Sequence, residues 1–285
     1  MEIVENAYAK LNLGLKILGR RDDGFHDILS LFQTIDLYDQ LVFGSVGSGE
    51  ILLSCDDPNL PVGPENLIYR AVLAFQKFTG ITQGVRVALT KRIPMEAGLG
   101  GGSSDAAAVL RVLNRMWNVG LSSAELCDLG AQLGSDVPFF MKKGTAIVTG
   151  RGEQLHYVPW KTDVFYVLVY PRFKVPTNWA FANFKKTLTG FGDYAKFLNS
   201  VDFNDLPVLD FLHHIENDFL PLVLETYPET KSILTQLANA GALISSMSGS
   251  GSTLYGVFDS KVVAKAVWAQ FKAEHFRAFL CCPTV

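Results

Sequence analysis

Four of the chain's 25 glycines fall within positions 98–102, and this cluster constrains the local fold more than any other feature. An alternating apolar run at 85–89 predicts a strand before it, and a helical apolar period from Ser104 to Trp117 predicts a helix after it. Glycine has no Cβ, so backbone N–H groups in such a loop can turn inward, where the start of the helix favours an anion. The two serine hydroxyls add donors. The segment predicts a phosphate cradle made of Pro94, Met95, Glu96, Ala97, Gly98, Leu99, Gly100, Gly101, Gly102, Ser103 and Ser104.

Two other phosphate-binding loops are excluded. A Walker A loop needs G-x-x-x-x-G-K-[ST] and a Rossmann fingerprint needs G-x-G-x-x-G, and the chain contains neither. A glycine-rich turn without a ligand is the alternative, because short motifs give many false matches. The serines and the strand–loop–helix setting favour the phosphate cradle.

Charge and composition exclude several classes of function. The 285 residues carry 25 Lys and Arg against 28 Asp and Glu, a formal charge of 25 − 28 = −3, so general nucleic-acid binding is not expected. No apolar run approaches the roughly 18–20 residues of a membrane span, and the first residues lack the features of a signal peptide. Four cysteines without a C-x-x-C pair predict reduced thiols in a cytoplasmic protein. Five histidines without metal-ligand spacing predict no histidine metal site.

The N-terminal segment alternates between apolar and polar residues, which predicts a half-buried strand over 8–17. Lys10 and Asn12 are then expected side by side on its polar face, pointing away from the core. Asn66 is expected to cap a helix at 67–79 that Gly80 ends. We further expect strands at 29–37 and 41–54, the latter interrupted by the turn signals of G-S-V-G-S-G-E at 44–50. The remaining expected elements are a helix at 123–133, a strand pair at 144–158, a strand at 164–170, helices at 177–188, 207–224 and 229–240, two strands joined by a loop at 242–258, a helix at 261–274 and a strand at 277–282.

The pattern of elements restarts after Pro159. We therefore expect two α+β halves, residues 1–157 and 158–285. A second glycine-rich segment lies at 248–252 in the second half, where its backbone could form a nest for another anion or brace the first loop. A tight turn is the alternative, because Ser and Gly are common turn residues. The candidates are Ser248, Gly249, Ser250 and Gly251.

Asp136 lies in G-S-D-V-P-F-F at 134–140 and has two interpretations. An Asp before a Pro-containing first turn is commonly an N-cap carboxylate. The functional alternative is a carboxylate in an apolar cleft that orients or deprotonates a hydroxyl. Lys10 is likewise either a solvated lysine or a cation that pairs with Asp136 and stabilises charge on a transferred phosphoryl group.

Gly24-Phe25-His26 is a turn followed by an aromatic ring and an imidazole. A lone histidine is more commonly structural or solvated. Beside an accessible Phe25, His26 could instead recognise a flat polar ring, with one side chain stacking and the other hydrogen-bonding.

The motif P-x-x-x-G-L-G-G-G-S-S resembles the signature of the GHMP kinase superfamily, which includes galactokinase, homoserine kinase and mevalonate kinase. Within it, the chain is most similar to the family of 4-diphosphocytidyl-2-C-methyl-D-erythritol kinases. The further matching motifs, in family order, are Ala9-Lys10-Leu11-Asn12-Leu13, Gly24-Phe25-His26, Leu29 with Phe32-Gln33, Glu65-Asn66-Leu67-Ile68, Gly134-Ser135-Asp136-Val137-Pro138-Phe139-Phe140 and Ser248-Gly249-Ser250-Gly251.

This resemblance implies a two-domain fold, with a ribosomal-protein-like N-terminal half that carries the phosphate loop and the catalytic residues, and a ferredoxin-like C-terminal half. It implies a kinase of the non-mevalonate isoprenoid pathway that uses ATP and Mg²⁺ to phosphorylate a hydroxyl of a cytidine-diphosphate-linked substrate. Asp136 would take the hydroxyl proton, and Lys10 would stabilise the ionised state and the transferred group. The phosphates of ATP would lie on the loop at 94–104.

The resemblance also implies binding roles. Asn12 and His26 would contact the substrate, the latter at its cytosine ring. Phe25 stands where the family usually has Tyr, so the stacking face is kept and the phenol hydroxyl is lost. Phe181 matches a second aromatic wall. On the ATP side, residues matching those that line the adenine are Asn66 and Lys91, and Ser104 is the loop candidate for a metal ligand.

Two rivals remain. One is another GHMP small-molecule kinase of homoserine or mevalonate type, against which the segment at 24–26 and the strand with Lys10 and Asn12 argue. The other is a nucleotide sensor that kept the fold and lost catalysis, since a fold alone does not fix function. The presence of Lys10, Asp136 and the whole loop argues against a sensor.

Overall fold

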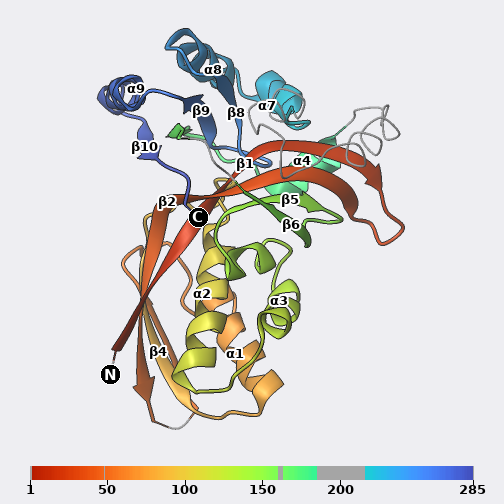
Figure 1. Ribbon diagram of the computed structural model, residues 1–285, viewed down its shortest axis with the longest axis vertical. Coiled ribbons are helices and arrows are strands. Elements are labelled where there is room, and N and C mark those ends of the chain that lie inside the picture. The colour runs from red at the N-terminus through yellow and green to blue at the C-terminus, as the bar shows by residue number, and fades with distance from the viewer. Residues whose placement is uncertain (1, 48, 160–162, 185–215, 285) are drawn as a thin grey trace. The chain divides into compact units, whose positions relative to one another are not determined.

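The computed structural model describes residues 2–47, 49–159, 163–184 and 216–284 (Figure 1). Within these ranges two sheets are combined with helices, which confirms the predicted α+β class. The chain forms two compact units, each made of three segments that alternate along the sequence. Unit 1 comprises Met1–Ala9, Leu37–Met95 and Gly100–Lys143, and unit 2 comprises Lys10–Asp36, Glu96–Leu99 and Gly144–Val285.

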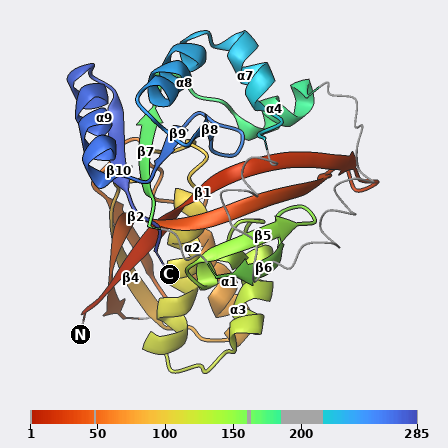
Figure 2. The ribbon, with the colours of Figure 1, turned by 45° about the horizontal axis from the view of Figure 1, so that its top comes forward.

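Two long paired strands, β1 Glu2–Arg20 and β2 His26–Val46, each contribute to both units (Figure 2). The predicted strand at 8–17 is confirmed within β1. The predicted break between strands at 29–37 and 41–54 is wrong, because β2 runs on without interruption and a separate β3, Ile51–Cys55, follows. The two halves of β2 pair with different partners, residues 30–33 with β5 and residues 40–46 with β4, and so both stay extended.

In unit 1 helices cover one face of the sheet. β4, Gly84–Thr90, lies between β2 and β3, antiparallel to β2 and parallel to β3. Helix α1, Leu67–Thr79, begins after its cap Asn66 and ends at Gly80, as predicted. It packs against β3 and against helix α2, Gly101–Met116. Helix α3, Ser123–Ala131, and the short 3-10 helix η1, Pro138–Met141, complete the unit.

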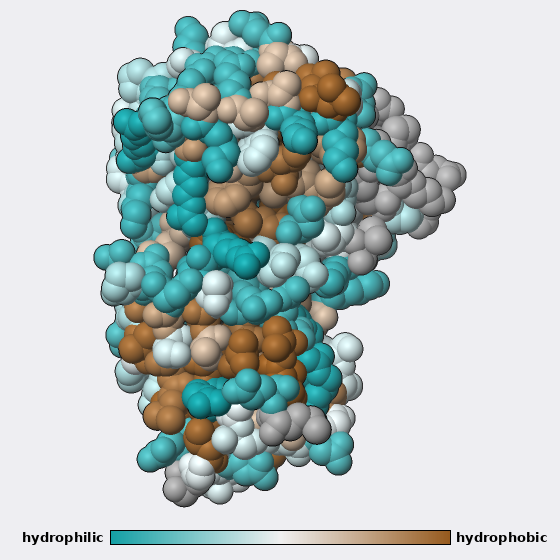
Figure 3. All heavy atoms as spheres, turned by 90° about the vertical axis from the view of Figure 1, so that its left-hand side faces the viewer, coloured by the Kyte–Doolittle hydropathy of each residue, from teal (hydrophilic) through white to brown (hydrophobic). Residues whose placement is uncertain are grey.

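The other face of this sheet is partly apolar and turned to solvent. In β4, Val87 is buried while its neighbour Arg86 is exposed, which is the predicted alternation of a half-buried strand. Val4 on β1 and Leu52 on β3 are large apolar side chains with 57% and 46% exposure. Figure 3 shows hydrophobic residues gathered in patches on the face of the molecule that it presents.

Unit 2 contains a four-stranded antiparallel sheet in the order β10-β7-β9-β8. Its strands are β7 Phe165–Tyr170, β8 Ile244–Met247, β9 Leu254–Phe258 and β10 Arg277–Cys281. Helices α8, Glu229–Asn239, and α9, Lys261–Ala273, pack on it, and their buried residues Leu237 and Phe271 join its core (Figure 2). The remaining elements are the hairpin β5 Thr145–Thr149 and β6 Gln154–Val158, and helices α4 Thr177–Asn183 and α7 Leu220–Thr226.

Two helices begin where the sequence did not predict. Helix α2 starts at Gly101 rather than Ser104, because Gly100, with φ +68°, turns the chain into the helix. The predicted helix at 207–224 lies largely outside the described residues, and its described part starts only at Leu220. Asn217 forms a β-bridge with Leu15, so this residue is not part of the helix. The end of the predicted helix at 177–188 also lies outside the described residues.

All four cysteines are free thiols, as predicted. In the described ranges, no helix is both long and apolar enough to cross a membrane.

Candidate functional site

The glycine-rich loop joins β4 to α2, which is the predicted setting. Its backbone is left-handed at Glu96 (φ +54°), Gly98 (φ +74°) and Gly100 (φ +68°). Gly100 is the N-cap of α2 and brings no side chain to the cap. The N–H groups of residues 101–103 lie in the first turn, where they have no partner within the helix and where the helix dipole is positive. The start of α2 is therefore suited to a phosphate.

The middle of the loop belongs to unit 2 and is held there by two other segments. Lys10 N donates a hydrogen bond to Leu99 O at 3.0 Å. Ser248 Oγ donates to Gly98 O at 2.8 Å and accepts from Asn12 N at 3.0 Å. A Cβ on Gly98 would lie 2.2 Å from Ser248 O, so no other residue fits. The second glycine segment thus braces the first, which is one of its two predicted roles.

Lys10 and Asn12 are buried, with 4% and 2% exposure, so the expectation of a half-buried strand is wrong here. The second glycine segment covers it, since a Cβ on Gly249 would lie 3.5 Å from Asn12 Nδ2 and 3.8 Å from Lys10 Nζ. Lys10 Nζ donates to Asn12 Oδ1 at 2.6 Å and lies 4.4 Å from the centre of the Phe32 ring, which attracts a cation. The solvated-lysine alternative is therefore excluded.

Asn217 holds the second glycine segment, and sequence reasoning missed it. Its Nδ2 donates to Met247 O and to Gly249 O, each at 2.7 Å, and its Oδ1 accepts from Phe219 N at 2.9 Å. At 2% exposure, this amide uses both of its donors. Only the short segment E-N-D-F at 216–219 could have signalled this role, and its residues suit several kinds of turn.

The other residues of the two glycine-rich segments differ in burial and in their contacts. Ser104 is buried in α2, and Glu96 is exposed and pairs with Lys174 at 2.8 Å. Ser250 Oγ lies 2.9 Å from Thr177 Oγ1, and a Cβ on Gly251 would lie 2.8 Å from a methionine sulfur of β8. Pro94, Ala97 and Leu99 are buried, whereas Gly102 is exposed.

The predicted aromatic residues all belong to unit 2. His26 and Phe181 stack on each other, with ring centres 5.0 Å apart and planes inclined by 22°. Phe25 is 56% exposed, and the Arg151 guanidinium lies 5.0 Å from its ring centre. Burial and the charge of Arg20 lower the pKa of His26, so the imidazole is neutral at pH 7 and can both donate and accept a hydrogen bond.

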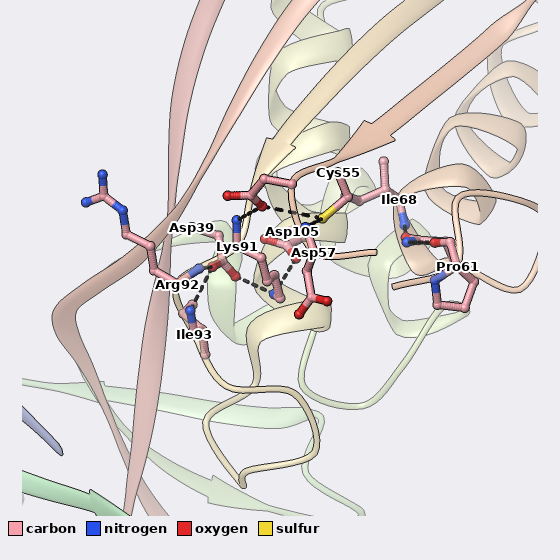
Figure 4. A network of polar contacts seen from close by, with 11 residues as sticks. Asp39, Cys55, Asp57, Pro61, Ile68, Lys91, Arg92, Ile93 and Asp105 are labelled. Atoms are coloured by element: carbon pink, nitrogen blue, oxygen red, sulfur yellow. Dashed lines mark hydrogen bonds and ion pairs between the residues drawn. The ribbon is translucent and has the colours of Figure 1, made fainter. Parts of the chain in front are cut away.

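Asn66 and Lys91 lie in unit 1, and Figure 4 shows Lys91 beside Asp39 and Asp105. Asn66 Oδ1 accepts from Ile68 N at 2.8 Å as the cap of α1, and its Nδ2 donates to Pro61 O at 2.6 Å. The Lys91 ammonium pairs with Asp39 and, at 2.9 Å, with Asp105. Burial lowers the pKa of Lys91, but the two carboxylates outweigh burial and raise it above its ordinary value.

Asp136 is half-buried in a turn before η1. That short helix begins after Val137, which makes no side-chain cap, so the N-cap interpretation of Asp136 is wrong. The aromatic residues Phe139 and Phe140 are buried, as predicted for this segment. Asp136 belongs to unit 1 and Lys10 to unit 2, and their pairing stays a prediction.

Asp39 and Asp105 were also missed from the sequence. Asp39 is one of three aspartates in β2, beside Asp27 and Asp36, and no motif marks it; Asp105 directly follows the two serines of the loop, which was the one available signal. Among the described residues no group of three or more His, Cys, Asp or Glu side chains is arranged to hold a metal ion.

Comparison with known proteins identifies the family. Residues 66–144 match the model of the GHMP kinases N terminal domain, and residues 202–278 match that of the GHMP kinases C terminal domain. The chain belongs to the GHMP kinase family. A crystal structure of 4-(cytidine 5'-diphospho)-2C-methyl-D-erythritol kinase superposes with a TM-score of 0.79 at 33% identity, covering 99% of this chain and 100% of that one. The predicted two-domain GHMP kinase fold is confirmed.

Curated relatives carry the same enzyme name over nearly their whole length. The chain is 40% identical to the 4-diphosphocytidyl-2-C-methyl-D-erythritol kinase of Chlorobium phaeovibrioides, covering 97% of this chain and 94% of the relative. It is 42% identical to the enzyme of that name from Thermodesulfovibrio yellowstonii, covering 91% and 90%. The homoserine kinase of Cytophaga hutchinsonii shares the fold, with a TM-score of 0.77 at 18% identity over 100% of this chain and 95% of that one.

The contact between Gly98 and Ser248 generates one prediction. We expect Gly98→Ala to lower the free energy of unfolding by more than about 2 kcal/mol, because the methyl group would overlap Ser248 O and a left-handed backbone disfavours Ala. Gly102→Ala is the matched control, since its Cβ would lie 3.5 Å from Leu67 Cδ1, an ordinary contact. Urea unfolding followed by circular dichroism measures both variants. Equal effects of the two substitutions would refute the brace.

A second prediction concerns Asn217. We expect Asn217→Asp to destabilise the protein by about 3 kcal/mol or more, because it removes both donors from two buried carbonyl groups and buries a charge near Asp218. Asn178→Asp, at an exposed position in the first turn of α4, is the control and should change stability by less than about 0.5 kcal/mol. The same urea experiment compares them. A near-neutral Asn217→Asp would mean that Asn217 does not hold the segment.

Proposed function

We propose that this chain is the ATP-dependent kinase that phosphorylates a hydroxyl of 4-diphosphocytidyl-2-C-methyl-D-erythritol in the non-mevalonate isoprenoid pathway. The observation that carries the proposal is the similarity, at about 40% identity over nearly the whole chain, to curated enzymes of that name. The loop before α2 and the buried pair of Lys10 and Asn12 supply the polar groups that such a reaction needs.

The chemistry assigned to the catalytic pair is a direct transfer. Asp136 accepts the proton of the substrate hydroxyl. The hydroxyl oxygen attacks the γ-phosphorus of ATP, and the bond from that phosphorus to the oxygen that bridges it to the β-phosphorus breaks to release ADP. Lys10 stabilises the negative charge of the reacting oxygens. The N–H groups of residues 101–103 hold phosphate oxygens at the start of α2. The protein takes little part in covalent chemistry, so positioning of the reactants and stabilisation of the phosphate charge provide most of the rate acceleration.

A magnesium ion fits this arrangement, because it needs only one or two oxygen ligands from the protein. The ion usually keeps several waters and binds one or two protein oxygens together with substrate phosphates. Ser104 is the residue of the loop whose hydroxyl would supply such an oxygen. When bound, Mg²⁺ would neutralise phosphate charge during transfer.

The cytidine end of the substrate is assigned to the aromatic residues of unit 2. The neutral imidazole of His26 can hydrogen-bond the polar edge of cytosine, and the rings of Phe25 and Phe181 offer faces for stacking. Asn12 is assigned to the substrate, and Asn66 and Lys91 to the adenine side of ATP. Phe25 contributes only its face, without the hydroxyl of the usual tyrosine.

Two further predictions, the domain borders and the location in the cell, belong to this proposal. The domain borders at 157 and 158 are supported by family matches that end at residue 144 and begin at residue 202. A cytoplasmic location is supported by the four free thiols.

The rival functions differ in what they turn over. A homoserine- or mevalonate-type kinase would consume ATP with an alcohol that carries no cytidine, and a sensor would bind ATP without turnover. An ATP-turnover assay with a panel of alcohols separates these cases. Turnover restricted to alcohols without cytidine, or none at all, would overturn the proposal.

The role of Asp136 yields a third prediction. We expect Asp136→Asn to lower kcat by at least about 10²-fold with ATP affinity nearly unchanged, because the amide cannot take the hydroxyl proton. Asp128→Asn, at an exposed position of α3, is the control and should retain wild-type kcat. Steady-state kinetics and calorimetry with a non-hydrolysable ATP analogue provide the two readouts. An unchanged kcat for Asp136→Asn would remove this residue from the mechanism.

A further inference from the structure

Asp39 is a fully buried carboxylate of unit 1 that the proposed reaction does not use. It projects from β2 toward the end of β4 (Figure 4). Its Oδ1 accepts hydrogen bonds from Arg92 N at 2.6 Å and Ile93 N at 2.8 Å, and its Oδ2 accepts one from the Lys91 ammonium. These three residues immediately precede the glycine-rich loop, so one carboxylate fixes the first stem of that loop.

Lys91 extends the connection to the second stem. Its ammonium also donates to Asp105 Oδ2 at 2.9 Å, in the part of α2 that directly follows the loop. A Cβ on Gly101 would lie 3.0 Å from Lys91 Nζ and 3.0 Å from Ile93 Cγ2. The loop backbone therefore lies against the ammonium. We call Asp39, Lys91 and Asp105 the stem cluster, because they join the residues on both sides of the loop.

The charges of the stem cluster do not balance if both carboxyl groups are ionised. Two buried carboxylates against one ammonium would leave a net negative charge, which is costly away from water. Asp105 Oδ1 is buried and has no hydrogen-bond partner among the described residues. Burial raises the pKa of Asp105 to about 7, with Lys91 opposing and Asp39 adding to the rise. A proton on Asp105 makes the cluster neutral.

We propose that the stem cluster sets the separation of the two loop stems for ATP, with Asp39 as the positioning residue. This inference rests on the proposed function, because it assumes that the loop binds ATP. Asp39 does not touch the nucleotide; it acts through the Lys91 ammonium and the N–H groups that it fixes.

Substitutions at the two carboxyl groups of the cluster provide the test. In Asp39→Asn an amide NH₂ faces either the Lys91 ammonium or the N–H groups of residues 92 and 93, donor against donor, and we expect the Kd for a non-hydrolysable ATP analogue to rise about 10-fold or more. In Asp105→Asn the amide oxygen can still accept from the Lys91 ammonium, and we expect the Kd to stay within about two-fold of wild type. Asp105→Ala removes this acceptor, and we expect its Kd to rise about 10-fold.

Calorimetry measures ATP binding without substrate, so the outcome does not depend on which alcohol is phosphorylated. Binding of cytidine diphosphate, measured in the same way, should be unchanged in all three variants. Wild-type ATP affinity in a folded Asp39→Asn protein would overturn the proposal, as would equal Kd values for Asp105→Asn and Asp105→Ala. If thermal unfolding shows that Asp39→Asn does not fold, the comparison of the two Asp105 variants decides. Wild-type protein that binds the ATP analogue normally but fails to phosphorylate the cytidylyl substrate would refute the proposed function alone.

Discussion

A loop whose backbone N–H groups stay free for an anion cannot use those groups for the hydrogen bonds that would fix its own shape. The loop at 94–104 is instead fixed by hydrogen bonds to other segments of the chain. In unit 1 the carboxylate of Asp39 holds the approach to the loop, and in unit 2 the hydroxyl of Ser248 holds its middle. Each of these supports is buried, because a hydrogen bond shielded from water holds a geometry more firmly than an exposed one.

The buried supports need their own partners, and this explains several features away from the loop. Ser248 lies in a segment fixed by Asn217, and Asn217 in turn forms a bridge with Leu15 of β1. Lys10 and Asn12 satisfy each other on the same strand. In the middle of β1 both faces are buried: Lys10 and Asn12 lie on one face, and Leu11 and Leu13 lie on the other. Its alternation therefore reflects two different buried environments rather than a core on one side and water on the other.

Much of the fold could be predicted because it depends on local pattern. The cap Asn66 and the terminating Gly80 fixed both ends of α1, and the alternation of β4 gave its buried face. The continuity of β2 could not be predicted, because it depends on pairing with strands that lie far along the sequence. The same limit hid Asp39 and Asn217, since neither residue has a local motif and each matters through partners at least about thirty positions away. The family signature supplied candidates for contact with ligands, but not the residues that support them.

The stacked pair of His26 and Phe181 sets a condition on how a flat ring enters that region. A base that slides between them exchanges one ring contact for two, so its net gain is a single contact rather than the full value of two. Stacking also accepts any base of similar size. In the proposed role, discrimination between pyrimidines falls to hydrogen bonds at the edge of the base. The neutral imidazole of His26 can supply one of these bonds, because its donor and its acceptor point in different directions and only one of them can face a given base. The stacked pair thus covers its own ring faces in the free protein, and stacking alone would not decide which base binds.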